Sequence, residues 1–127
     1  MKERERRRIG CHLMLRKPLV VLLVLAGCSK GPEADLQYIK QARSAAAEWA
    51  LVNQQAAEGK VTPTYVSSMH KWLRQEVQSA STALTAPDAP YAAEISALLE
   101  QPDDASPDSL RARSDALKTI EDQLESA

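Results

Sequence analysis

One long segment without helix-breaking residues constrains the fold of this chain more than any other feature. No glycine or proline occurs between Asp35 and Glu58, and alanine is abundant in this stretch. Alanine has the highest helix propensity, and glycine and proline have the lowest, so we expect one helix over residues 35–58. Gly59 follows at once and can adopt the left-handed conformation that often ends a helix. The segment therefore predicts a long helix with a sharp end.

Start signals further along the chain predict three more helices. Thr62-Pro63 and Ser106-Pro107 each place a hydroxyl residue at the N-cap and a proline at the first helical position. Apolar residues at helical spacing follow each signal, and no stretch alternates as a strand would. The sequence predicts an all-α fold, a small antiparallel bundle made of a helical hairpin and two shorter helices. The expected helices span about residues 35–58, 62–85, 89–101 and 107–125 of a domain covering 35–127.

The connection around Gly59 is short enough to make the first two helices antiparallel neighbours. If the turn is centred near residue 60, residues whose numbers add to about 119 lie level across the hairpin. Small residues of the first helix then face large residues of the second, which favours close packing. The expected pairs are Ala42 with Val77, Ala46 with Leu73, and Ala50 with Met69.

Two charged residues, Arg43 and Glu76, also fall level in this register, and both lie on otherwise apolar arcs of their helices. An unpaired charge at a buried position costs several kcal/mol. We therefore expect Arg43 and Glu76 to form a structural ion pair, and a buried charged pocket is the alternative.

The aromatic residues carry the main candidate for a partner or ligand surface. The chain contains no phenylalanine, so Trp49 and Trp72 are its largest apolar groups, and we expect both in the core or at its edge. His70 lies nearly level with Trp49, and Tyr65 and Tyr91 can border the same region. If an apolar patch is exposed for a partner, these five residues are where we expect it.

The charge of the chain changes sign at Cys28. Seven basic and two acidic residues occur up to this position, and nine basic and fifteen acidic residues occur after it. A basic head before an apolar run is typical of secretion signals. The acidic remainder argues against binding to nucleic acid, whose phosphates it would repel.

The apolar run spans residues 18–27, about ten residues, whereas a helix needs about twenty to cross a bilayer. It ends in Leu25-Ala26-Gly27-Cys28, which resembles the lipobox of bacterial type II signal peptides. The resemblance implies that residues 1–27 are removed, with Met14 as an alternative start. It also implies that Cys28 becomes the lipid-bearing first residue of a bacterial lipoprotein.

The residues after the lipobox refine this prediction. Ser29 stands where an aspartate would retain a proteobacterial lipoprotein, so the resemblance implies transfer to the outer membrane, on its periplasmic face. The inner membrane is the alternative. Residues 28–34 contain Gly31 and Pro32 and show no apolar periodicity, so we expect a flexible tether there. The attached acyl chains would hold the protein at the membrane.

No pattern for catalysis or metal binding occurs in the mature part. His70 is its one histidine, which excludes a His pair on one helix, and the nucleophile motif GxSxG is absent. We therefore expect no enzyme activity, no catalytic residue and no metal. We also expect no cofactor other than the covalent lipid on Cys28.

Two hypotheses for the function remain. The first is a lipid-anchored helical module that binds or positions another protein of the cell envelope. The second is a small-ligand-binding or inhibitor-type lipoprotein with a pocket between the first two helices, near Trp49, His70, Arg43 and Glu76. A filled core with outward-facing aromatics favours the first hypothesis, and a cavity of a few hundred cubic ångströms within the bundle favours the second.

Overall fold

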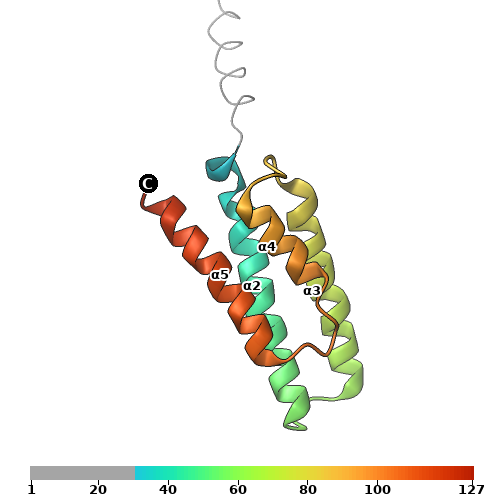
Figure 1. Ribbon diagram of the computed structural model, residues 1–127. Coiled ribbons are helices and arrows are strands. Elements are labelled where there is room, and N and C mark those ends of the chain that lie inside the picture. The colour runs from blue at the N-terminus through green and yellow to red at the C-terminus, as the bar shows by residue number, and fades with distance from the viewer. Residues whose placement is uncertain (1–30) are drawn as a thin grey trace, which may run out of the picture.

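The computed structural model describes residues 31–127 as a bundle of four helices (Figure 1). These are α2 (Pro32–Ala57), α3 (Pro63–Ala83), α4 (Pro90–Leu99) and α5 (Pro107–Glu125), and the described chain contains no strand. The expected all-α helical bundle is thereby confirmed. Within this part, no helix combines the length and apolar character needed to cross a bilayer. The lipobox, Leu25 to Cys28, and the sorting residue Ser29 lie outside the described residues.

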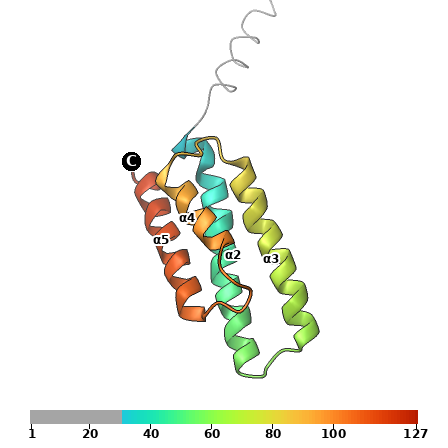
Figure 2. The same ribbon diagram turned by 45° about the vertical axis from the view of Figure 1, so that its right-hand side comes forward.

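The long helix α2 is the centre of the bundle. It packs against each of the other three helices, with α3 along one flank and α5 along another (Figures 1 and 2). The short helix α4 crosses the bundle obliquely between α3 and α5 (Figure 2). Ala42, Ala46 and Ala50 of α2 are buried. Their small side chains let neighbouring helices approach closely, so one helix can serve as the core of three interfaces.

The expected register of the α2–α3 hairpin is confirmed. Trp49 and His70, whose numbers add to 119, have ring centroids 6.2 Å apart. About two helical turns away, the Gln41 side chain donates to the backbone carbonyl of Glu76 at 3.0 Å. Leu73 and Val77 are fully buried in the cluster that contains the alanines of α2.

The predicted start and stop signals also act as expected. Thr62 Oγ1 accepts a hydrogen bond from the Tyr65 amide, and Ser106 Oγ accepts one from the Ser109 amide, both at 3.1 Å. Gly59 has a φ of 70° just after α2 ends, a conformation that disfavours any residue with a Cβ. Local capping chemistry thus determines where α3 and α5 begin and where α2 ends.

The start of α2 differs from the prediction. Residues 32–34 were expected in a tether spanning 28–34, but the helix already begins at Pro32. Proline lacks an amide hydrogen and has a fixed φ, both of which suit the first position of a helix. Gly31 is the N-cap with a φ of 86°, and its carbonyl accepts from the Asp35 amide at 2.9 Å. What resembled a flexible break is the cap of the helix.

The expected Arg43–Glu76 ion pair is wrong. Arg43 Nε instead contacts Glu121 Oε1 of α5 at 2.5 Å, and the Glu121 side chain is 6% exposed. Glu76 accepts from Gln41 Nε2 at 3.4 Å. Arg43 lies on the flank of α2 that α5 covers, so its partly buried charge is paired with a residue of a helix far away in the sequence.

A buried carboxylate, Asp35, joins α2 to the connection between α3 and α4. Its side chain is fully buried and accepts four hydrogen bonds. Oδ1 accepts from the amide and the hydroxyl of Thr85, each at 2.8 Å. Oδ2 accepts from the Ala86 amide at 3.1 Å and from the Tyr91 hydroxyl at 2.7 Å. Thr85 Oγ1 in turn accepts from the Gly31 amide, so the network also fixes the point where the chain enters the bundle.

This network shifts two pKa values in opposite directions. Burial raises the pKa of Asp35, but the hydrogen bonds from Thr85, Tyr91 and Ala86 together outweigh it, so the pKa lies below its ordinary value. Burial, and then the hydrogen bond to Asp35, raise the pKa of Tyr91 to about 12. The charged carboxylate and the neutral phenol are therefore the native forms over a wide range of pH.

Replacement of this carboxylate tests how much it stabilises the fold. Asp35→Asn places an amide NH2 against the Ala86 amide or the Thr85 amide, which leaves a buried donor unsatisfied. We expect the free energy of unfolding at pH 7 to fall by about 3 kcal/mol, as measured by urea denaturation.

The same variant has a characteristic pH dependence. A carboxyl whose pKa is lower in the folded state stabilises the fold above its unfolded pKa, and this contribution is lost as the pH falls through the folded pKa. The difference between wild type and Asp35→Asn should therefore shrink as the pH is lowered below about 4. Asp88→Asn, at an exposed position of the same connection, serves as the control and should match wild type. A constant difference across this range would show that ionised Asp35 is not the source of the stability.

Candidate functional site

The structure divides the five residues expected at a partner or ligand surface. Trp49 is 0% exposed and Tyr91 is 3% exposed, so the expectation is wrong for these two, which belong to the core. Trp72 and Tyr65 are 48% and 46% exposed, and the exposure of His70 is intermediate between that of the buried pair and that of the exposed pair. The core or core-edge expectation is thus correct for Trp49, whereas Trp72 points outward because it lies beyond the flank of α3 that faces the bundle.

Trp49 and Arg74 hold the connection between α4 and α5, residues 100–106. The indole N–H of Trp49 donates to the Asp103 carbonyl at 3.0 Å. The Arg74 guanidinium stacks over the Trp49 ring, with Cζ 4.8 Å from the ring centroid. Its Nε contacts Asp103 Oδ1 at 2.6 Å, and its other nitrogens donate to the carbonyls of Leu99 and Gln101. One arginine thereby satisfies the end of α4 and the connection that follows it.

Asn53 completes this attachment and orients His70. Its Nδ2 donates to the carbonyls of Asp103 and Ala105 at 2.9 and 2.8 Å. Since both partners are acceptors, the NH2 group must face them, and Oδ1 must face His70. His70 Nε2 lies 2.7 Å from that oxygen, so it carries the proton and donates. In the neutral imidazole, Nδ1 is then the acceptor.

Sequence reasoning missed Asp35 and Asn53, although a signal for both exists. Each lies on the same helical stripe as the buried residues Ile39, Ala42 and Ala46. A polar residue on an apolar stripe needs buried hydrogen-bond partners, which helix termini and connections provide.

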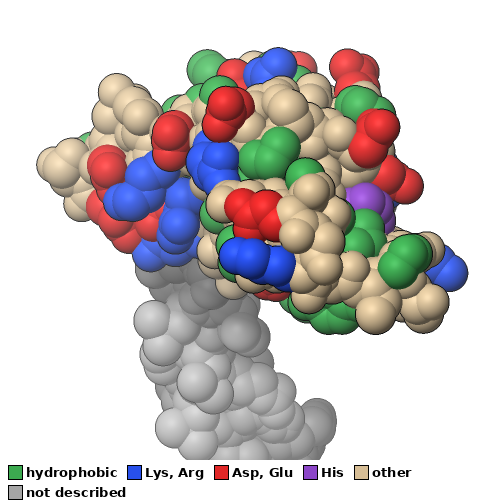
Figure 3. All heavy atoms as spheres, turned by 90° about the horizontal axis from the view of Figure 1, so that it is seen from below, with side chains coloured by type: hydrophobic (Ala, Val, Ile, Leu, Met, Phe, Trp, Pro, Cys, Tyr) green, Lys and Arg blue, Asp and Glu red, His purple; other side chains and the backbone are tan. Residues whose placement is uncertain are grey.

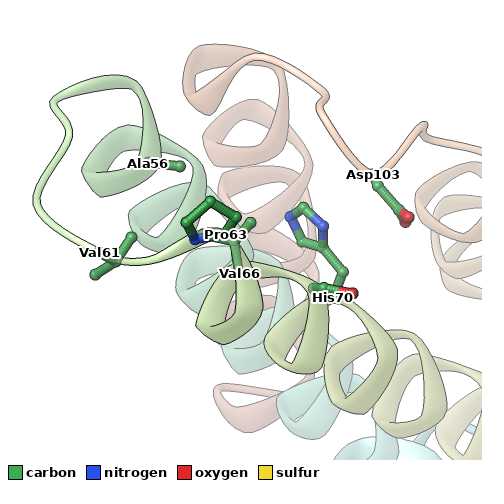
Figure 4. A pocket seen from close by; sticks show the side chains of 7 residues that line it. Ala56, Val61, Pro63, Val66, His70 and Asp103 are labelled. Atoms are coloured by element: carbon green, nitrogen blue, oxygen red, sulfur yellow. The ribbon is translucent and has the colours of Figure 1, made fainter.

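A hollow beside His70 opens at the end of the bundle where α2 joins α3. Two adjoining pockets of about 380 and 350 Å³ meet there, and both are lined by Ala56, Val66 and His70. We call them together the His70 pocket. The imidazole stands between Val66 and Pro63 on one side and the connection carrying Asp103 on the other (Figure 4). Hydrophobic and acidic side chains both reach the surface at this end of the molecule (Figure 3).

A second hollow runs along the outer side of the hairpin. It has a volume of about 250 Å³, and we call it the α2–α3 groove. It is lined by Gln41, Ser44, Ala45 and Glu48 of α2 and by Trp72 and Glu76 of α3. Beyond the groove, Leu51 and Tyr65 are each about half exposed, which extends the apolar surface along the same two helices.

The pocket expected near Trp49, His70, Arg43 and Glu76 does not form as a unit. Trp49 fills the core, His70 lines the His70 pocket, and Glu76 lines the α2–α3 groove. Arg43 faces α5, on another flank of α2. No group of three or more potential metal-ligating side chains occurs within residues 31–127.

No family model, no curated protein and no solved structure matches this chain.

Removal of the Asn53 amide tests whether the side chains of α2 hold the α4–α5 connection. Asn53→Ala leaves the buried carbonyl of Ala105 without its side-chain donor and leaves the Asp103 carbonyl with Trp49 as its one side-chain donor, so we expect the free energy of unfolding to fall by about 3 kcal/mol. Hydrogen exchange measured by NMR should become faster at the Ala105 amide, which donates to Pro102 within the connection.

The matched control is Gln55→Ala, a partly buried position on α2 outside this network. It should leave exchange at Ala105 unchanged. Equal protection of Ala105 in wild type and Asn53→Ala would show that the connection is held by other contacts.

Proposed function

We propose that this protein is a lipid-anchored module of the bacterial cell envelope whose helical bundle binds another protein. The anchor is the covalent lipid on Cys28, and the binding surface is the outer side of the α2–α3 hairpin. One observation supports the assignment of the binding surface. Leu51, Tyr65 and Trp72 are 51%, 46% and 48% exposed on the hairpin, while the core residues Trp49 and Leu73 are fully buried.

The arrangement of the bundle supports this assignment. α4 and α5 cover the inner side of the hairpin, which leaves its outer side without a helix (Figure 2). Tyr65, Met69 and Trp72 are spaced four and three residues apart on α3, so they share one helix face. Exposed aromatic residues arranged in this way are typical of protein-binding surfaces.

The lipid attachment fits the position of this surface. Cys28 precedes the start of α2 by only a few residues. At a rise of 1.5 Å per residue, Glu48 lies roughly 25 Å further along α2 than its first turn. A membrane at the N-terminal end of α2 would leave the outer side of the α2–α3 hairpin accessible to a protein in the periplasm.

A small-ligand-binding function is the second candidate, and the His70 pocket is the observation that favours it. Its two parts have volumes in the range of ligand pockets, and His70 offers a polar group among apolar residues. The pocket is open to solvent rather than enclosed in the bundle. The protein-binding assignment therefore has the stronger support.

Lipid attachment is tested by labelling the host bacterium with radioactive palmitate. The wild-type protein should take up the label, and Cys28→Ser should take up none. Leu51→Ala, which leaves the cysteine in place, is the control and should be labelled like wild type. Equal label in wild type and Cys28→Ser would refute the anchor.

Protein binding is tested by photo-crosslinking in living cells, with benzoylphenylalanine placed at Ser44 or Leu51. We expect a discrete crosslinked product at both positions, and at least a fivefold loss of it when Trp72→Ala is added, because the indole supplies much of the contact area. Thr119, exposed on α5, is the control position and should give no such product. The same product from Thr119, or its persistence with Trp72→Ala, would contradict the assigned surface.

A further inference from the structure

The α2–α3 groove has an acidic character that the fold itself does not neutralise. Within residues 31–127, seven of the eight lysines and arginines form ion pairs with carboxylates other than Glu48 and Glu76. The eighth, Lys71, is exposed on α3 and forms no ion pair with a described residue. Glu76 receives a hydrogen bond only from the neutral Gln41 side chain, and Glu48 lines the groove without an ion-pair partner in this part of the chain.

The two carboxylates lie on opposite walls of the groove. Glu48 comes from α2 and lies nearly level with Trp72, and Glu76 comes from α3 one helical turn further along. The hairpin register separates them by roughly 8 Å along the groove. Ser44 and Ala45, whose side chains are small, also line the groove. A long side chain can therefore enter between the two acids.

Trp72 provides the apolar part of this site. Its indole is about half exposed at the groove, so one side is open to a side chain from outside. Cations bind favourably over the faces of indole rings, and arginine does so most often. The bundle already contains this interaction, because Arg74 stacks over Trp49 with Cζ 4.8 Å from the ring centroid.

The size of the groove also limits its occupant. Its volume of about 250 Å³ is smaller than most pockets that enclose small molecules. It suits one long side chain presented by another protein, with the aliphatic stem against the indole and the charged head near the carboxylates.

We propose that the partner protein inserts a basic side chain, arginine or lysine, into the α2–α3 groove, where it stacks on Trp72 and pairs with Glu48 and Glu76. This rests on the proposed function and specifies the chemistry of the partner. The surface thus selects a segment that carries a basic residue beside apolar ones, and it repels acidic segments.

The test uses the acylated protein purified from its host in a non-ionic detergent and labelled with ¹⁵N-tryptophan. The sequence contains two tryptophans, so the spectrum has two indole N–H signals. The probe is the blocked peptide acetyl-Ala-Leu-Arg-Ala-Ala-Leu-Arg-Ala-amide. We expect it to shift the Trp72 signal and to leave the Trp49 signal in place, because Trp49 is buried and bonded to Asp103.

Two comparisons isolate the role of charge. A peptide with citrulline in place of arginine keeps the shape but not the charge, and we expect it to bind at least fivefold more weakly. The double variant Glu48→Gln with Glu76→Gln should weaken binding of the arginine peptide at least tenfold. The matched control, Glu100→Gln with Asp115→Asn, removes the same net charge at two exposed positions elsewhere and should change binding less than twofold.

Four results would overturn the proposal. Equal binding of the citrulline peptide would show that the occupant need not be basic. Equal weakening in the control variant would show a general attraction to an acidic protein. An unshifted Trp72 signal would place the peptide elsewhere. A Trp72 shift that follows protein concentration without peptide would identify a second copy of the chain as the occupant.

The crosslinking experiment separates failure of this proposal from failure of the proposed function. A product that depends on Trp72 but survives Glu48→Gln with Glu76→Gln would keep the protein-binding surface and refute the basic occupant. Absence of any product would refute the surface itself.

Discussion

Two polar side chains buried on α2 hold the non-helical parts of the bundle in place. Asp35 receives four hydrogen bonds from the α3–α4 connection and from Tyr91, and Asn53 donates two to the α4–α5 connection. A connection has no regular backbone hydrogen bonding of its own, so its amides and carbonyls need partners wherever it is buried. Both connections find these partners on the central helix. The position of α4, which lies between the two connections, follows from these two attachments.

The sequence predicted the features that depend on neighbouring residues. Gly59, Thr62 and Ser106 act through contacts within a few residues, and the α2–α3 register follows from a short turn that leaves no other arrangement. Arg43 shows where this approach fails. Its partner was sought within the hairpin, but Glu121 lies 78 residues away, and no local pattern indicates which flank of α2 the last helix covers. Asp35 and Asn53 were missed for the same reason, since their partners belong to connections whose paths only the tertiary fold determines.

The two tryptophans show how the same side chain acquires different roles in one hairpin. Trp49 lies on the flank of α2 that faces α3 and the α4–α5 connection, where its N–H and its ring both find partners from other segments. Trp72 lies on α3, which packs on α2 and α4 but has no contact with α5. A four-helix arrangement with α2 at its centre must leave part of α3 uncovered. The outer side of the hairpin is therefore exposed to solvent because of the topology, and the proposed binding surface is assigned to it for this reason.

The apolar surface on this side supports the proposed partner binding, but its area alone does not specify a partner. Three half-exposed side chains offer roughly 300 Å², worth about 7 kcal/mol if fully covered. Association itself costs about 4–15 kcal/mol in lost motion, so apolar contact alone gives weak and unselective binding. In the proposed complex, charge pairing provides the selectivity between partners that apolar contact area alone does not provide. The internal ion pairs occupy every basic residue of the described chain except Lys71, which leaves Glu48 and Glu76 as acceptors for a charge from outside. Under the proposed function, a basic side chain of the partner would supply the charge that these two carboxylates lack within the described chain.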